Sequence, residues 1–139
     1  KVAVVCGILS GTLASLTGIF VLCMLFGFNH QQYVTMLPKS ITTAIGIGIS
    51  EELGGIVTIT VAVIIITGIL GNVIADTVFH IFKIKNPLAK GLALGTASHA
   101  IGTARAIEMG PVEGAMSSLA VAVAGLLTVV FVSGFAQLI

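Results

Sequence analysis

Three long apolar segments constrain this sequence more than any other feature. They cover residues 2–28, 56–82 and 115–139, and the only charged side chain inside them is Asp76, near the end of the second segment. A transmembrane helix needs about 20 consecutive, predominantly apolar residues. The second segment is rich in β-branched residues, but its length favours a helix over a strand. The sequence therefore predicts an all-α polytopic membrane protein with three strong transmembrane helices.

The composition excludes a soluble domain. Hydrophobic residues make up 57% of the sequence and charged residues only 8%, whereas a soluble domain carries about 25% charged residues. Most of the surface must therefore face a lipid bilayer. The net charge is +1 and no run of Lys and Arg is present, so the chain has no basic patch that would bind nucleic acid.

Two further segments, residues 39–55 and 90–110, concentrate glycines and polar side chains. They read KSITTAIGIGISEELGG and KGLALGTASHAIGTARAIEMG. Glycine is a poor helix former, and both segments are too polar to face lipid and too apolar to form surface loops. Irregular backbone at membrane depth is tolerated where it is buried within the protein. We therefore expect two glycine-interrupted helices, either broken or re-entrant.

These two segments also resemble each other and form an internal repeat. Aligning Gly46 with Gly102 also aligns Ala44 with Ala100, Ile45 with Ile101, Glu52 with Glu108, Gly54 with Gly110 and Thr42 with Ser98. Paired, glycine-interrupted hydrophobic segments indicate the substrate site of a secondary transporter. The alternative is a pair of ordinary packing helices that are rich in small residues.

The charges are compatible with two topologies. If both segments cross the bilayer, one face holds Lys39, Lys83, Lys85 and Lys90, and the other holds Glu51, Glu52, Glu108, Glu113 and Lys1. The basic face would then be cytoplasmic and the repeats would run parallel. If both segments are re-entrant, they enter from opposite faces and the repeat is inverted. The sorting of charges favours the crossing topology.

The strongest candidate for a binding residue is Arg105. An arginine within a membrane segment is costly and indicates a functional site, and its planar guanidinium can hold a carboxylate through two hydrogen bonds. Hydroxyls and freed backbone N–H groups at a helix break would hold the rest of a small anion. The candidate substrate-binding residues are Arg105, His99, Ser98, Thr103, Gly102, Thr42, Thr43 and Gly46.

Two members of this set have structural alternatives. Arg105 could instead pair with Glu108, three residues further along the same helix. His99 is suited to proton relay because imidazole titrates near neutral pH, but a hydrogen-bonded histidine that packs between helices is equally consistent with the sequence.

No pattern in the sequence indicates catalysis. The motifs of serine hydrolases, zinc peptidases and phosphate-binding loops are absent, and Cys6 and Cys23 do not have a zinc-ligand spacing. We therefore expect a protein that is not an enzyme and that needs no metal and no cofactor.

Two stretches resemble the LrgB/CidB family of bacterial membrane proteins. They are residues 37–56, LPKSITTAIGIGISEELGGI, and residues 91–126, in which ASHAIGTARA is followed by IEMGPVEGAMSS. The resemblance covers essentially the whole chain. It implies that residues 1–139 form a single transmembrane domain, the C-terminal part of a longer multi-pass protein of the cell's inner (plasma) membrane.

The family resemblance implies two functions. Members are described as antiholin-like or holin-like proteins that modulate murein hydrolase activity and lysis, together with a small LrgA/CidA-type membrane partner. Related plastid proteins are similar to glycolate/glycerate translocators, and bacterial members are linked to transport of small monocarboxylates such as pyruvate. We therefore expect a transporter of small carboxylate anions, with an LrgA/CidA-type protein and further copies of the chain as candidate partners. The alternative is a non-transporting regulatory protein that assembles with a holin-like partner.

Overall fold

The computed structural model describes residues 1–139 and is built from α-helices alone. The helices are α1 (Val2–Phe26), α2 (His30–Met36), α3 (Thr43–Glu52), α4 (Val57–Ile81), α5 (Pro87–Met109) and α6 (Pro111–Ala136). Three of them, α1, α4 and α6, are long and apolar enough to cross a membrane. The predicted all-α fold with three strong transmembrane helices is therefore confirmed.

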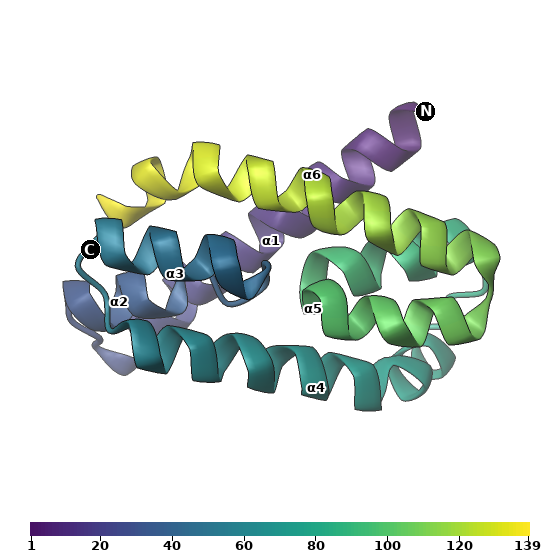
Figure 1. Ribbon diagram of the computed structural model, residues 1–139, viewed down its shortest axis with the longest axis horizontal. Coiled ribbons are helices and arrows are strands. Elements are labelled where there is room, and N and C mark those ends of the chain that lie inside the picture. The colour runs from purple at the N-terminus through teal and green to yellow at the C-terminus, as the bar shows by residue number, and fades with distance from the viewer.

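The three long helices extend along the length of the bundle (Figure 1). Near its start, α1 packs against α6 through Ile8 and Ala120; near its end, Cys23 lies in one buried cluster with Ala136. α1 and α6 therefore run in the same general direction, and α4 runs in the opposite direction. We call the end of the bundle where α1 and α6 begin the N-end, and the opposite end the C-end.

α5 is a re-entrant hairpin. Its backbone leaves helical geometry at His99, where φ is 43° and ψ is −137°, and two helical arms fold back on each other from this point (Figure 1). Leu94 on the incoming arm and Ala106 on the outgoing arm lie in the same buried cluster. The α5 hairpin is thus a helix folded in half, with His99 at its tip.

Both arms of the α5 hairpin end at the N-end, beside the start of α6. A Cβ atom at Gly91 on the incoming arm would collide with the main chain of Glu113, and a Cβ atom at Gly114 would lie 2.9 Å from the Ile107 side chain on the outgoing arm. The crossing topology that the charges favoured is therefore wrong for this segment, and the re-entrant alternative is the observed one.

Helices α2 and α3 form a second re-entrant hairpin, which enters from the C-end. At its start, the Nδ1 atom of His30 lies 2.7 Å from the main-chain oxygen of Ile139. Near its end, the Ser50 hydroxyl forms a hydrogen bond of 2.8 Å with the hydroxyl of Thr60, in the first turn of α4. Both arms therefore lie against the C-end, and the tip is formed by residues 37–42 between them.

The breaks in the helices do not lie at the glycines that predicted them. α3 runs without interruption through Gly46 and Gly48, and the α2–α3 hairpin turns at residues that include Pro38, which cannot donate a helical hydrogen bond. Gly46 instead permits close packing, because a Cβ atom there would collide with the Ile64 side chain of α4.

The aligned positions of the repeat occupy equivalent places in the two hairpins. Residues 44–46 open the outgoing arm of the α2–α3 hairpin, and residues 100–102 open the outgoing arm of the α5 hairpin. Because the hairpins enter from opposite ends, the repeat is inverted and not parallel.

The charges are also distributed differently from the crossing topology. The N-end holds residues of both signs: Lys83, Lys85, Lys90, Glu108 and Glu113. Lys39 lies inside the bundle, at the tip of the α2–α3 hairpin, where it is partly buried. Charge sorting failed because it placed Lys39 on a membrane face and assumed that residues 90–110 cross the bilayer.

Candidate functional site

The tip of the α5 hairpin is held between α4 and α6 by buried polar contacts. The Nε2 atom of His99 lies 2.9 Å from the main-chain oxygen of Ile64; because a carbonyl can only accept, this nitrogen carries the proton. The Thr103 hydroxyl donates to the main-chain oxygen of His99 at 2.9 Å and lies 2.7 Å from the Ser117 hydroxyl of α6. The tip is therefore positioned by hydrogen bonds on both sides.

Two glycines of α4 allow this tip to approach closely. A Cβ atom at Gly68 would lie 2.8 Å from the His99 ring, and one at Gly71 would collide with the Ser98 hydroxyl. The sequence prediction singled out Ser98 and His99 but missed these glycines and Ser117. The small-residue spacing of Gly68 and Gly71 on an otherwise bulky helix is the signal that would have found them.

The candidate residues of the α2–α3 hairpin lie at its tip. Thr42 is the N-cap of α3, although its side chain makes no capping hydrogen bond, and Thr43 is the first residue of the helix. Gly46 packs against Ile64, the residue whose main-chain oxygen bonds to His99. The structure therefore brings both sets of predicted residues to the same level of α4.

The two tips also meet beside α1. Ser40, Ile41 and Thr96 line one small cavity. Ser15, in the middle of α1, donates a hydrogen bond of 2.8 Å to the Ser40 hydroxyl, and a Cβ atom at Gly11, one turn earlier, would lie 2.9 Å from the Thr96 Cβ atom. The tips of the two hairpins thus lie next to each other in the middle of the bundle.

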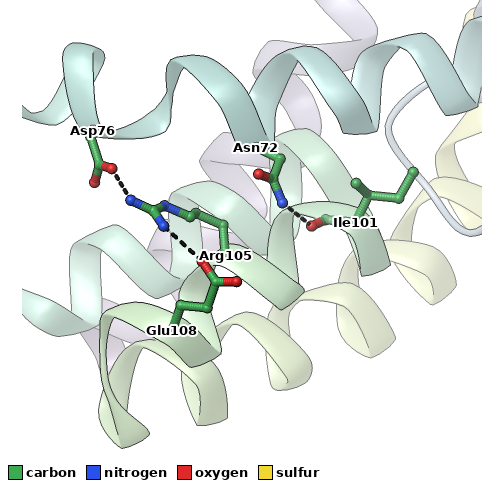
Figure 2. A network of polar contacts seen from close by, with 5 residues as sticks. All are labelled: Asn72, Asp76, Ile101, Arg105 and Glu108. Atoms are coloured by element: carbon green, nitrogen blue, oxygen red, sulfur yellow. Dashed lines mark hydrogen bonds and ion pairs between the residues drawn. The ribbon is translucent and has the colours of Figure 1, made fainter.

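Arg105 is not part of this meeting point. It lies on the outgoing arm of α5, closer to the N-end than His99 by more than one helical turn. Its guanidinium forms ion pairs with Asp76 of α4 and, at 2.7 Å, with Glu108 of the same arm (Figure 2). The pairing with Glu108 is the structural alternative that the sequence left open. The anion-binding role of Arg105 stays a prediction.

A further contact supports the same junction between α4 and α5. The Asn72 side chain donates a hydrogen bond of 3.0 Å to the main-chain oxygen of Ile101, just after the hairpin tip (Figure 2). Asn72 and Asp76 are four residues apart and lie on one face of α4. Together with Arg105, they fasten the outgoing arm of the hairpin to α4.

A groove of about 730 Å³ leads from the N-end to the meeting point of the tips. Its walls are formed by α1 and the incoming arm of α5, and most of the residues are small, including Gly7, Gly11, Ala14, Ala89, Ala93 and Ala97. Lys39, Ser40 and Ser15 lie at its inner end. Sequence reasoning missed this feature because it assigned Lys39 to a membrane face.

The chain is similar to known proteins over nearly its whole length. The sequence model of the LrgB-like family matches residues 1–138. The antiholin-like protein LrgB of Bacillus subtilis (strain 168) is 40% identical over 136 residues, which are 98% of this chain and 59% of that protein. The protein of the same name from Bacillus cereus (strain B4264) is 42% identical over 128 residues, which are 92% of this chain and 56% of that protein.

These similarities confirm the family resemblance carried by residues 37–56 and 91–126. The chain spans somewhat more than half the length of the curated relatives that it matches. No solved structure matches the chain. With three helices suited to crossing a membrane and a family match over residues 1–138, the chain is a membrane protein that belongs to the LrgB-like family.

Proposed function

We propose that this chain forms the translocating part of a secondary transporter for small monocarboxylates of the pyruvate, glycolate or glycerate type. The observation that carries the proposal is the pair of inverted re-entrant hairpins whose tips meet in the middle of the bundle. In secondary transporters, inverted repeats with discontinuous helices form the substrate site near the middle of the membrane.

The tips offer suitable chemistry for an anion. α3 begins at the hairpin tip with Thr43, and the first main-chain hydrogen bond of the helix is donated by the N–H group of Gly46 to the main-chain oxygen of Thr42. The N–H groups that precede Gly46 are therefore free of helical partners, as at every helix start. The start of α3 therefore places the positive end of the helix dipole inside the bundle, where it favours a negative charge.

In this proposal, the predicted binding residues supply hydroxyl groups at the hairpin tips, and their glycines allow a ligand to approach the main chain there. Thr42, Thr43 and Gly46 supply the α2–α3 side, and Ser98, His99, Gly102 and Thr103 supply the α5 side. His99 and Thr103 already bond within the protein, so in this proposal they shape the tip. Arg105 stays outside the tip, in its ion pairs with Asp76 and Glu108.

The proposal also accounts for the name of the relatives. They are called antiholin-like, and in our proposal an influence on murein hydrolase activity and lysis follows from altered carboxylate flux across the plasma membrane. An LrgA/CidA-type membrane protein would then act on the transporter, as a partner that changes its activity.

Uptake by the purified full-length protein tests this function. Reconstituted into liposomes, it should give saturable uptake of radiolabelled glycolate or pyruvate that unlabelled substrate competes away. Empty liposomes and liposomes that hold an unrelated membrane protein are the controls. Uptake no higher than in these controls, together with stable co-purification of an LrgA/CidA-type partner, would favour the regulatory alternative.

A further inference from the structure

Lys39 stands out among the charged residues because it lies inside the bundle without a carboxylate partner. The ion pairs of the chain are those of Arg105 with Asp76 and Glu108. The Lys39 ammonium makes one hydrogen bond, which it donates to the Ser40 hydroxyl at 2.8 Å. A charged side chain at membrane depth is costly unless it is paired, and it is therefore a functional-site hypothesis by default.

Around Lys39, several N–H and O–H donors have no acceptor within the chain. An ammonium group has three N–H donors, and one of them is used by Ser40. The hydroxyls of Ser15 and Ser40 are 2.8 Å apart and share one hydrogen between them, so one hydroxyl hydrogen is left. Two ammonium hydrogens and one hydroxyl hydrogen thus have no acceptor within the chain, and a ligand that supplies only acceptors would complete the site.

The other hydroxyls of the groove do not compete for this role. Thr96 donates to the main-chain oxygen of Leu92 at 2.9 Å, and Ser10 donates to that of Gly7 at 3.0 Å. Both hydroxyl hydrogens are therefore used within their own helices. The free ammonium and hydroxyl donors of the groove lie at its inner end, where Lys39, Ser40 and Ser15 are close together.

The groove has room for a small anion beside Lys39. It extends from Ala3 and Asn86 at the N-end to Lys39, and most of the side chains that line it are small. A ligand with one anionic group and a short, weakly polar body would fit, with the anionic end at Lys39. Lys39 forms no ion pair within the chain. It therefore does not have to break one in order to bind such a ligand.

We propose that Lys39, assisted by the hydroxyls of Ser40 and Ser15, binds the carboxylate of the transported monocarboxylate at the inner end of the groove between α1 and α5. This inference rests on the proposed function and deepens it, since it assigns the anion to Lys39 and not to Arg105.

The test measures both binding and uptake with the full-length protein in neutral phosphatidylcholine, so that no anionic lipid can occupy the site. Lys39→Gln should weaken glycolate binding and raise the KM for uptake at least tenfold, because a hydrogen bond to a charged group is lost. Lys39→Arg should retain part of the binding, and Ser40→Ala should weaken it less than Lys39→Gln. Glycolamide, which has the same size but no charge, should not compete with glycolate.

Lys85→Gln is the matched control, because Lys85 is exposed in the loop that precedes α5. It should leave binding and KM unchanged. Thermal stability of Lys39→Met separates a binding role from a structural one: removal of an unpaired charge should leave the melting temperature unchanged or raise it.

The outcomes separate this inference from the proposed function. If the wild type takes up glycolate and Lys39→Gln does so with an unchanged KM, the Lys39 site is wrong and the transporter proposal stands. If the wild type neither binds nor transports any of the three carboxylates, both proposals fail. If glycolate binds through Lys39 but is not transported, the site stands and the transport function fails.

Discussion

The Nε2 atom of His99, at the tip of the α5 hairpin, lies 2.9 Å from the main-chain oxygen of Ile64 in the middle of α4. This oxygen belongs to a helix that continues without a break, and a carbonyl has a second lone pair for an additional donor. Gly68 makes the approach possible, because a side chain there would collide with the imidazole ring. This hydrogen bond therefore helps to fix the turning point of the re-entrant helix α5 against the continuous helix α4.

The backbone conformation of His99 gives a prediction about stability. Its φ of 43° and ψ of −137° are unfavourable for any residue other than glycine, at a cost of about 1–3 kcal/mol. His99→Ala loses the bond to Ile64 and keeps the strain, whereas His99→Gly loses the bond and relieves the strain. We therefore expect His99→Ala to lower the melting temperature in detergent more than His99→Gly does. A lower melting temperature for His99→Gly would contradict this explanation.

The packing of α5 against α6 gives a second prediction. At Gly95, a Cβ atom would collide with the main-chain oxygen of Ser117 and lie 2.7 Å from the Ala120 Cβ atom. Overpacking of this kind costs about 1–3 kcal/mol, so Gly95→Ala should lower the melting temperature. Gly48→Ala is the control, because no atom lies within 4 Å of a Cβ there and alanine favours the helix by about 1 kcal/mol. Equal effects of the two substitutions would argue against this packing.

Much of the fold could be predicted because hydrophobicity and length decide which helices span a membrane. Residues 2–28, 56–82 and 115–139 required no knowledge of tertiary contacts. The direction of the two polar segments did require it, since a crossing helix and a hairpin can have the same composition. The turn at His99 depends on the contacts of His99 with Ile64 and of Thr103 with Ser117, which the sequence alone does not show.

The junction of α4 and α5 gives a third prediction. Arg105 and Asp76 are partly exposed, with side-chain exposures of 32% and 59%, and exposed ion pairs contribute little to stability. If Arg105 serves only to fasten the hairpin, Arg105→Gln and Asp76→Asn should have small and similar effects on melting temperature and on the KM for glycolate. Loss of uptake in Arg105→Gln but not in Asp76→Asn would instead show that the guanidinium contacts the substrate, as the sequence predicted.

The candidate site was predictable only in part, because a polar residue that interrupts an apolar pattern can lie either inside the protein or at a membrane face. Ser98, His99 and Gly102 were proposed as candidates because they interrupt an apolar pattern. Lys39 interrupts it as well, but a lysine near the end of a polar break is also typical of a membrane face. The hydrogen bonds of Ser40 with Ser15 and with Lys39 place Lys39 in the middle of the bundle.

Side-specific labelling of single cysteines tests the central claim, the pair of inverted re-entrant hairpins, most directly. In a full-length variant without Cys6 and Cys23, cysteines at positions 52, 85 and 113 would each be exposed to a membrane-impermeant reagent from one side at a time. The α5 hairpin predicts that positions 85 and 113 are labelled from the same side and position 52 from the opposite side. Labelling of positions 85 and 113 from opposite sides would mean that α5 crosses the membrane, and would contradict the inverted architecture on which the proposed function rests.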